Sequence, residues 1–107
     1  MRAHPAAIGF LRRDVSGVQL QWHRAQIQHV ARRLGYDLCQ TMILDPRAER
    51  SEPGLTAAVS DLEADAIITP SLEHFDGAVP DDIVQLADVI TVSPENTYAR
   101  WVLPPLG

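Results

Sequence analysis

Residues 6–44 decide the fold of this chain: AAIGFLRRDVSG (6–17), VQLQWHRAQIQHVARRLG (18–35) and YDLCQTMIL (36–44). The first segment opens with a continuous, largely apolar run, which is typical of a strand covered on both faces of a parallel sheet. The second segment has apolar residues at helical spacing, and the third segment is again apolar. A strand, a helix and a second strand in this order predict the opening of an α/β domain.

The remaining elements are expected from the same patterns. The helix over residues 18–34 has one apolar stripe, and Gly35 should end it; the stripe consists of Leu20, Ile27, Val30, Ala31 and Leu34. Strands and helices should alternate along the rest of the chain. Two more strands are expected over 65–69 and 88–92, and two more helices over 52–62 and 80–87. An irregular segment or one helical turn is expected over 71–79, and a turn of helix within 95–107. About four strands alternating with three helices predict a three-layer α/β domain, with a mainly parallel sheet and helices on both faces.

Composition indicates one globular domain over residues 1–107, with flexible ends at 1–5 and 104–107. The chain is 46% hydrophobic and 21% charged, and 14 acidic residues against nine basic ones give a formal charge of −5. Domains that grip duplex DNA usually show a basic excess, so we expect DNA binding by this domain alone to be weak or absent. No apolar run is long enough to span a membrane and no signal sequence is evident, so a cytoplasmic protein without membrane contact is expected.

The cysteine and histidine content offers no metal or cofactor site. Cys39 is the only cysteine, which excludes an intramolecular disulfide and a cysteine zinc site, and its apolar strand predicts that it is buried. His23 and His29 are six residues apart on a helix, so they do not share a face at metal-ligand spacing. Glu73, His74 and Asp76 form a small polar cluster after a strand, which we interpret as a structural loop.

Several phrases of the chain resemble the amino-terminal catalytic domain of the serine recombinases, the resolvase/invertase family. They are Gly9-Phe10-Leu11-Arg12-Arg13-Asp14 after the first strand, Ala31-Arg32-Arg33-Leu34-Gly35-Tyr36 at the helix end, Glu52-Pro53-Gly54-Leu55 before a helix, and Leu72-Glu73-His74-Phe75-Asp76-Gly77 after the third strand. The resemblance spans nearly the whole chain and implies a resolvase-like, flavodoxin-like topology. It implies no cofactor. The family's long dimerisation helix and DNA-binding domain have no counterpart among these residues, and we expect both to be absent.

The resemblance also implies where the chemistry would lie. The family attacks a DNA phosphate with a serine and stabilises the phosphate oxygens with several arginines. Arg12 matches the first arginine of that set. The other positions are replaced: Asp14 stands for the serine, Glu52 for the loop arginine, Glu73 and His74 for an Asp-Arg pair, and Gly77 for the last arginine. These replacements predict a degenerate, catalytically inactive relative, a pseudoenzyme.

Ser16 leaves an alternative alignment open. Val15-Ser16 matches the family's Val-Ser if Arg13-Asp14 is a two-residue insertion, which would make Ser16 the nucleophile and Arg12 its cationic partner. The role that we favour for Ser16 is a cap of the following helix, because a serine there satisfies unpaired amides. Either way, the other arginines are missing.

Three functional hypotheses follow. The first is an inactive resolvase-like domain that acts through protein contacts, with another protein or with itself as a homodimer; Trp22, off the apolar stripe, and Trp101, in an apolar tail, are its interaction candidates. The second is a residual enzyme, either with recombinase activity through Ser16 or with an Asp14, Glu73 and His74 set that acts on some phosphate ester. The third is a nucleic-acid-binding regulator related to DNA recombination, which would use a basic face made by Arg12, Arg13, Arg24, Arg32 and Arg33.

Overall fold

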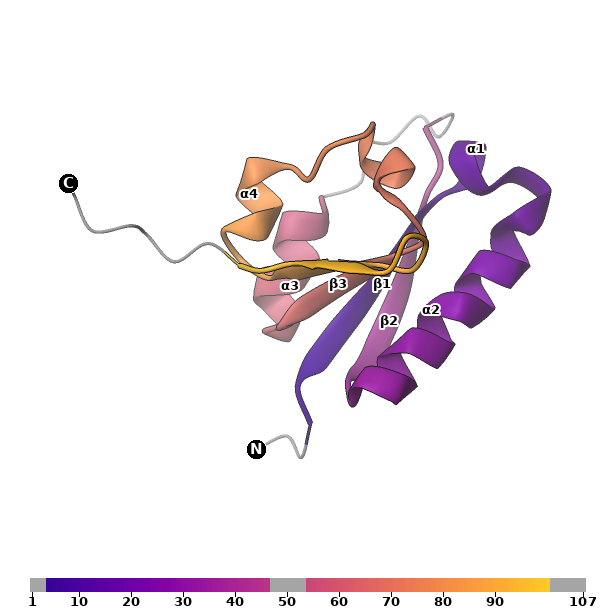
Figure 1. Cartoon of the computed structure of the whole chain (residues 1–107). Helices are drawn as coiled ribbons and strands as arrows, with labels where there is room; N and C mark the ends of the chain where they lie inside the picture. Colours follow the sequence, from indigo (N-terminus) through magenta and orange to yellow (C-terminus); the bar gives the residue numbers. More distant parts are fainter. Residues whose placement is uncertain (1–3, 47–53, 101–107) are drawn as a thin grey trace.

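The computed structural model describes residues 4–46 and 54–100, and these form an α/β fold around one five-stranded sheet. The strands are β1 (Ala6–Arg12), β2 (Asp37–Leu44), β3 (Ala66–Thr69), β4 (Asp88–Thr91) and β5 (Asn96–Tyr98). They lie in the order β2-β1-β3-β4-β5 (Figure 1). The pairings among β1, β2, β3 and β4 are parallel, whereas β5 is antiparallel to β4. The predicted α/β class and mainly parallel sheet are confirmed.

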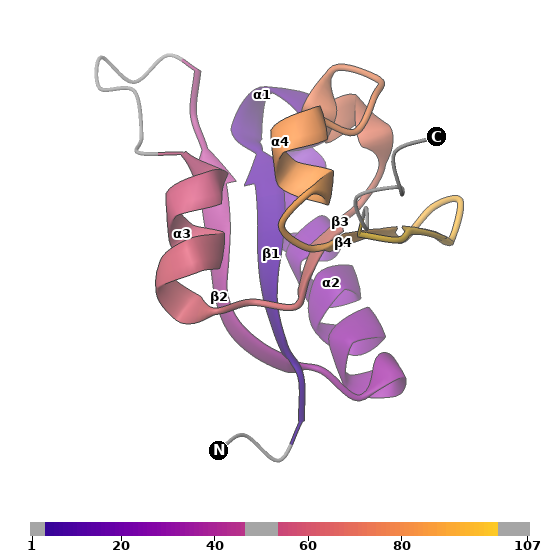
Figure 2. The same ribbon diagram turned by 90° about the vertical axis from the view of Figure 1, so that its left-hand side faces the viewer.

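Helical segments connect the strands. They are α1 (Arg13–Ser16), the 3-10 turn η1 (Gly17–Gln19), α2 (Leu20–Leu34), α3 (Leu55–Leu62), the 3-10 turn η2 (Leu72–Phe75) and α4 (Asp81–Val84). Figure 1 shows α2 on one side of the sheet and α3 and α4 on the other, and the perpendicular view in Figure 2 agrees. None of the helices in the described part of the chain is long and apolar enough to cross a membrane.

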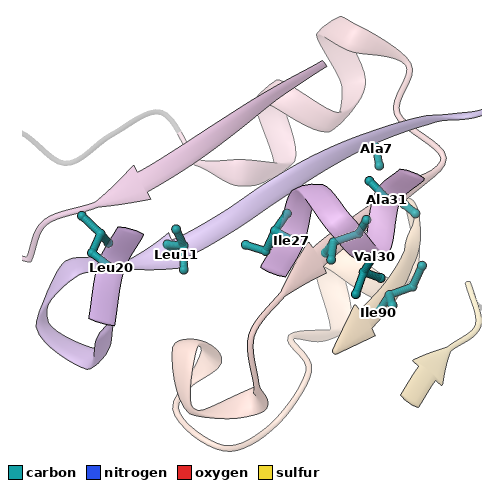
Figure 3. Close-up of a cluster of buried hydrophobic side chains, with 9 residues drawn as sticks. Ala7, Leu11, Leu20, Ile27, Val30, Ala31 and Ile90 are labelled. Carbon is teal, nitrogen blue, oxygen red and sulfur yellow. The ribbon is translucent and has the colours of Figure 1, made fainter. Parts of the chain in front are cut away.

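Alternation along β1 divides the core between the two sides of the sheet. Ala7 and Leu11 face the buried stripe of α2, whereas Ile8 and Phe10 join the cluster on the opposite side. The α2 side contains Ala7, Leu11, Leu20, Ile27, Val30, Ala31, Ala66, Ile68 and Ile90 (Figure 3). Burying one aliphatic side chain of this size is worth about 1.5–3 kcal/mol. The contact between α2 and the sheet is therefore a major source of stability.

Gly9 allows α2 to lie this close to β1. A Cβ atom built on Gly9 would lie 2.9 Å from Cγ2 of Ile27 and 2.9 Å from Oγ1 of Thr41. Both distances are shorter than van der Waals contact, so a side chain at this position would push the helix or β2 away. A small residue is needed here because of the close approach.

The helix expected over residues 18–34 begins later than predicted and buries a shorter stripe. α1 and η1 precede it, and α2 itself starts at Leu20 and ends at Leu34, with Gly35 as the predicted cap after its last residue. Leu20, Ile27, Val30 and Ala31 are buried, but Leu34, the last residue of the helix, is 41% exposed.

Two predictions about the sheet were wrong. The described residues form five strands where about four were expected, because the chain after β4 forms β5, which pairs Thr97 with Ile90. A helical turn was expected within residues 95–107; the described part of that stretch contains β5, and residues 101–107 lie outside the described residues. Cys39 was expected to be buried, but it is exposed. It lies in β2, which forms the edge of the sheet opposite to β5. An apolar sequence run does not reveal whether a strand lies at the centre or at the edge. Glu52, Trp101 and residues 104–107, on which predictions were made, lie outside the described residues.

Candidate functional site

Residues far apart in the sequence meet at the carboxyl end of β1. Arg12 is the last residue of β1, Asp14 lies in α1, and His74 and Asp76 lie in and just after η2. In open α/β sheets, ligand and catalytic groups gather at this edge, where strands lead into helices. The structure thus brings Arg12, Asp14 and His74, which were singled out from the sequence, together with Asp76.

The guanidinium of Arg12 is occupied by two carboxylates. Its Nε and Nη2 donate to Oδ1 and Oδ2 of Asp14 at 3.2 and 2.8 Å, and its Nη1 donates to Oδ1 of Asp76 at 2.5 Å. The hydrogen bond from Arg12 is the main cause that lowers the pKa of Asp14, and the two carboxylates raise the pKa of Arg12. Bidentate pairing with a carboxylate uses the same donor geometry that would grip a phosphate. We call this group of Arg12, Asp14 and Asp76 the arginine clasp.

The neighbouring arginine makes a longer and more exposed ion pair. Nε of Arg13 lies 3.9 Å from Oδ2 of Asp45, just after β2, and the two side chains are 54% and 42% exposed. A pair exposed to this degree holds Arg13 only weakly compared with the hydrogen-bonded pairing of Arg12.

His74 is buried and holds the backbone of β1. It is 2% exposed, and the backbone N–H of Arg12 donates to its Nδ1 at 2.9 Å. An accepting Nδ1 carries no proton, so the ring proton is on Nε2. Burial is the main cause that lowers the pKa of His74 to about 4, and the charges of His23 and Arg12 act in the same direction. His74 is therefore neutral at pH 7 and supplies no positive charge at this edge of the sheet.

Ser16 does not take the capping role considered from the sequence. Its Oγ lies 2.8 Å from Nδ1 of His23 and its side chain makes no capping hydrogen bond to the following turn. Ser16 is only 4% exposed. The His23 ring meets the His74 ring edge to face, with centroids 5.8 Å apart. Ser16 thus joins α1 to α2 and, through His23, to the η2 segment.

A polar pocket of about 240 Å³ lies beside these histidines, at the carboxyl ends of β3 and β4. Its lining comprises Val15, Gln19, His23, Gln26, Pro70, Ser71, Glu73, His74 and Ser93. The lining contains neither Ser16 nor any arginine, and its one acidic side chain is that of Glu73. Among the described residues, no three His, Cys, Asp or Glu side chains are placed to hold a metal ion.

Gly77 stands where the resemblance would require the last arginine. Its φ is +94°, a conformation that side-chain-bearing residues rarely adopt. Asp76, immediately before it, also has a positive φ of 58°. The turn that places Asp76 next to Arg12 therefore has a backbone conformation at position 77 that disfavours arginine.

A second, mostly apolar groove of about 490 Å³ runs between α2 and the turn from β4 to β5. Trp22 lies in this groove and is 62% exposed. We call it the α2 groove; it is lined by Trp22, Ala25, Gln26, His29, Val30, Arg33, Val92 and Glu95. Arg33 and Glu95 form an ion pair across it. Of the two interaction candidates named from the sequence, Trp22 is the one that the structure describes. No pattern in the sequence pointed to Val92 and Glu95, which line the same groove from the turn between β4 and β5.

Comparison with protein-family models, with curated proteins and with solved structures gives no match to this chain. Membership of the serine recombinase family therefore stays a prediction from the motifs.

Proposed function

We propose that this chain is a catalytically inactive, resolvase-like domain that acts by binding another protein. The observation that carries the proposal is the arginine clasp, in which the one matched arginine donates to Asp14 and Asp76 instead of facing an open site. The order β2-β1-β3-β4 with helices on both sides supports a resolvase-like, flavodoxin-like arrangement, in which the fifth strand is antiparallel.

The clasp argues against phosphoryl transfer at this edge of the sheet. Transfer to a serine needs an accessible hydroxyl and cations that stabilise the charge developing on the phosphate oxygens. Here Ser16 is buried, Asp14 and Asp76 would repel a phosphate, and His74 is neutral at pH 7. Losing one electrostatic stabiliser typically costs about 100- to 1000-fold in rate, so the loss of several removes turnover.

A binding role agrees with the surface that the fold leaves exposed. Val18 and Trp22 lie on the surface at the start of the α2 region, and Trp22 opens onto an apolar groove. Exposed tryptophan in a groove is typical of protein contacts.

The test asks whether the chain cleaves DNA or forms a covalent bond with it. The purified chain is incubated with supercoiled plasmid and with labelled duplexes, and nicking and covalent protein–DNA adducts are measured on denaturing gels. We expect neither product, and no duplex binding that falls steeply with added salt. An adduct that disappears in Ser16→Ala would establish the recombinase hypothesis instead, and salt-sensitive duplex binding would favour the regulator hypothesis.

A further inference from the structure

The polar pocket lies where two neighbouring parallel strands lead to opposite sides of the sheet. β1 leads through α1 and η1 into α2 on one side, whereas β3 leads through η2 to α4 on the other side (Figure 1). In doubly wound sheets with this strand order, the change of side leaves a crevice at the carboxyl ends of the first and third strands, and ligands bind there. The pocket is lined from both strands, by Val15 and Gln19 after β1 and by Ser71, Glu73 and His74 after β3.

A buried hydrogen-bond donor opens onto this pocket. His74 is 2% exposed and its Nδ1 accepts from the backbone N–H of Arg12, so its proton is on Nε2. Among the described residues, no group accepts a hydrogen bond from Nε2, yet the one buried side-chain nitrogen or oxygen without a partner is Oγ1 of Thr69. Nε2 is therefore not sealed in the core. It faces the pocket that His74 lines and offers one N–H to an occupant.

The charges around the pocket argue against an anionic occupant. Glu73 is the one acidic side chain of the lining, and the lining contains no arginine or lysine. Arg12, which is bound to His74 through its backbone, already donates its side chain to Asp14 and Asp76. A phosphate or carboxylate ligand would meet Glu73 without an arginine or lysine to balance the charge. An N–H group of a ligand can instead donate to the Glu73 carboxylate.

The remaining polar side chains suit a ligand that both donates and accepts. Gln19 and Gln26 contribute amides, and Ser71 and Ser93 contribute hydroxyls. Oγ of Ser71 accepts from the backbone N–H of Glu73 at 3.3 Å, which leaves its own hydroxyl proton for an occupant. The volume of about 240 Å³ lies below the range of about 300–1,000 Å³ typical of sites for drug-sized ligands, so it fits one small molecule.

We propose that the polar pocket binds a small uncharged molecule with an amide edge, such as a primary carboxamide. The carbonyl oxygen of the ligand accepts from Nε2 of His74, and its N–H group donates to the carboxylate of Glu73. A carboxamide places this acceptor and this donor side by side, and it carries no negative charge. The inference goes beyond the proposed function, because it assigns a small-molecule site that depends neither on a protein partner nor on the lack of catalysis.

The test uses the full chain and benzamide as the probe, with benzoate and benzamidinium as matched compounds of the same shape. Benzoate replaces the amide N–H group by a second carboxylate oxygen, and benzamidinium has donors but no acceptor. The assigned ring resonances of His23 and His74 are followed by nuclear magnetic resonance at pH 7 during titration with each compound. We expect saturable shifts with benzamide at a Kd on the order of 1 mM, which so few atoms can supply. Benzamidinium should bind about tenfold more weakly, because Nε2 of His74 then lacks an acceptor, and benzoate should not bind.

Variants of the lining test the two ends of the assignment. Glu73→Gln should weaken benzamide binding about threefold or more and allow benzoate to bind, because it removes the negative charge from the pocket. Asp82→Asn removes the same charge from α4 and should change neither. Gln26→Ala should weaken benzamide binding about fivefold through the loss of a hydrogen-bonding side chain, whereas Gln28→Ala, the same change on the exposed side of α2, should leave it unchanged.

Four outcomes would overturn the inference. They are no saturable shift of the His74 ring with benzamide, binding of benzoate as tight as that of benzamide, binding of benzamidinium at least as tight, or equal effects of Gln26→Ala and Gln28→Ala. Shifts that are confined to the Trp22 indole would place benzamide in the α2 groove and would also overturn it. These failures leave the proposed lack of catalysis intact, since nicking and adduct formation are measured separately.

Discussion

Nδ1 of His74 accepts a hydrogen bond from the backbone N–H of Arg12 at 2.9 Å, across 62 residues of sequence. This contact fastens η2 to the end of β1 and so sets the position from which Asp76 reaches the Arg12 guanidinium. The imidazole acts here as a buried neutral acceptor. It is a structural link between the two segments that form the candidate site.

Protonation of His74 should destabilise the fold. Its pKa is about 4 in the folded chain against an ordinary 6.5, so the unfolded chain binds the extra proton first as the pH falls. The stability that the neutral His74 ring contributes to the fold is complete above pH 6.5, declines below that pH and is lost once the pH falls below about 4. Its total is on the order of 3 kcal/mol of unfolding free energy. Asp14 stays ionised over most of this window because its pKa lies below 3.8.

Urea unfolding at pH 7.5 and pH 5.0 measures this effect. His74→Asn keeps an acceptor for the Arg12 N–H but has no titrating ring, so the loss of unfolding free energy between the two pH values should be smaller in the variant. Equal losses in the two proteins would show that another group is responsible.

Ser16 and His23 should be energetically coupled. Ser16→Ala leaves Nδ1 of His23 without its hydroxyl partner, and we expect a loss of about 1 kcal/mol in unfolding free energy. A double-mutant cycle with His23→Ala should give a coupling energy of similar size. A coupling energy near zero would refute the link between α1 and α2.

Gly9→Ala should destabilise the contact between α2 and the sheet. The added methyl group would lie 2.9 Å from Ile27 and Thr41, and overpacking of this kind costs about 1–3 kcal/mol. Gly54→Ala is the control, because its Cβ would meet no atom closer than 3.7 Å, and we expect it to cost less than about 1 kcal/mol. Thermal unfolding monitored by circular dichroism compares the two, and equal losses would mean that the close approach at Gly9 is tolerated.

Local patterns in the sequence were enough to predict the class of the fold, but they did not show which strands lie at the edges of the sheet. The stripe from Leu20 to Ala31 and the continuous apolar run of β1 are local signals, and both elements were predicted from them, although α2 begins at Leu20 and not at residue 18. The exposure of Cys39 and the antiparallel pairing of β5 both depend on which strands lie next to each other. Strand order is a property of the whole sheet.

The site was predictable as a set of residue types but not as a set of contacts. Arg12, Asp14 and His74 were singled out by motif, whereas the pairing of Arg12 with Asp76 joins residues 64 positions apart and has no sequence pattern. Burial decides the roles of Ser16 and His74, and burial at a loop is set by tertiary packing.

The claim that the arginine clasp excludes phosphate is tested most directly by nuclear magnetic resonance of the Arg12 Nε–H group during titration with inorganic phosphate at pH 7. We expect no shift in the wild-type chain, because Asp14 and Asp76 occupy the guanidinium. A saturable shift should appear in the double variant Asp14→Asn, Asp76→Asn, which removes both carboxylates. The matched control Asp81→Asn, Asp82→Asn removes the same charge from α4 and should behave like the wild type. A wild-type shift as large as that of the clasp variant, or no shift in the clasp variant, would contradict the claim.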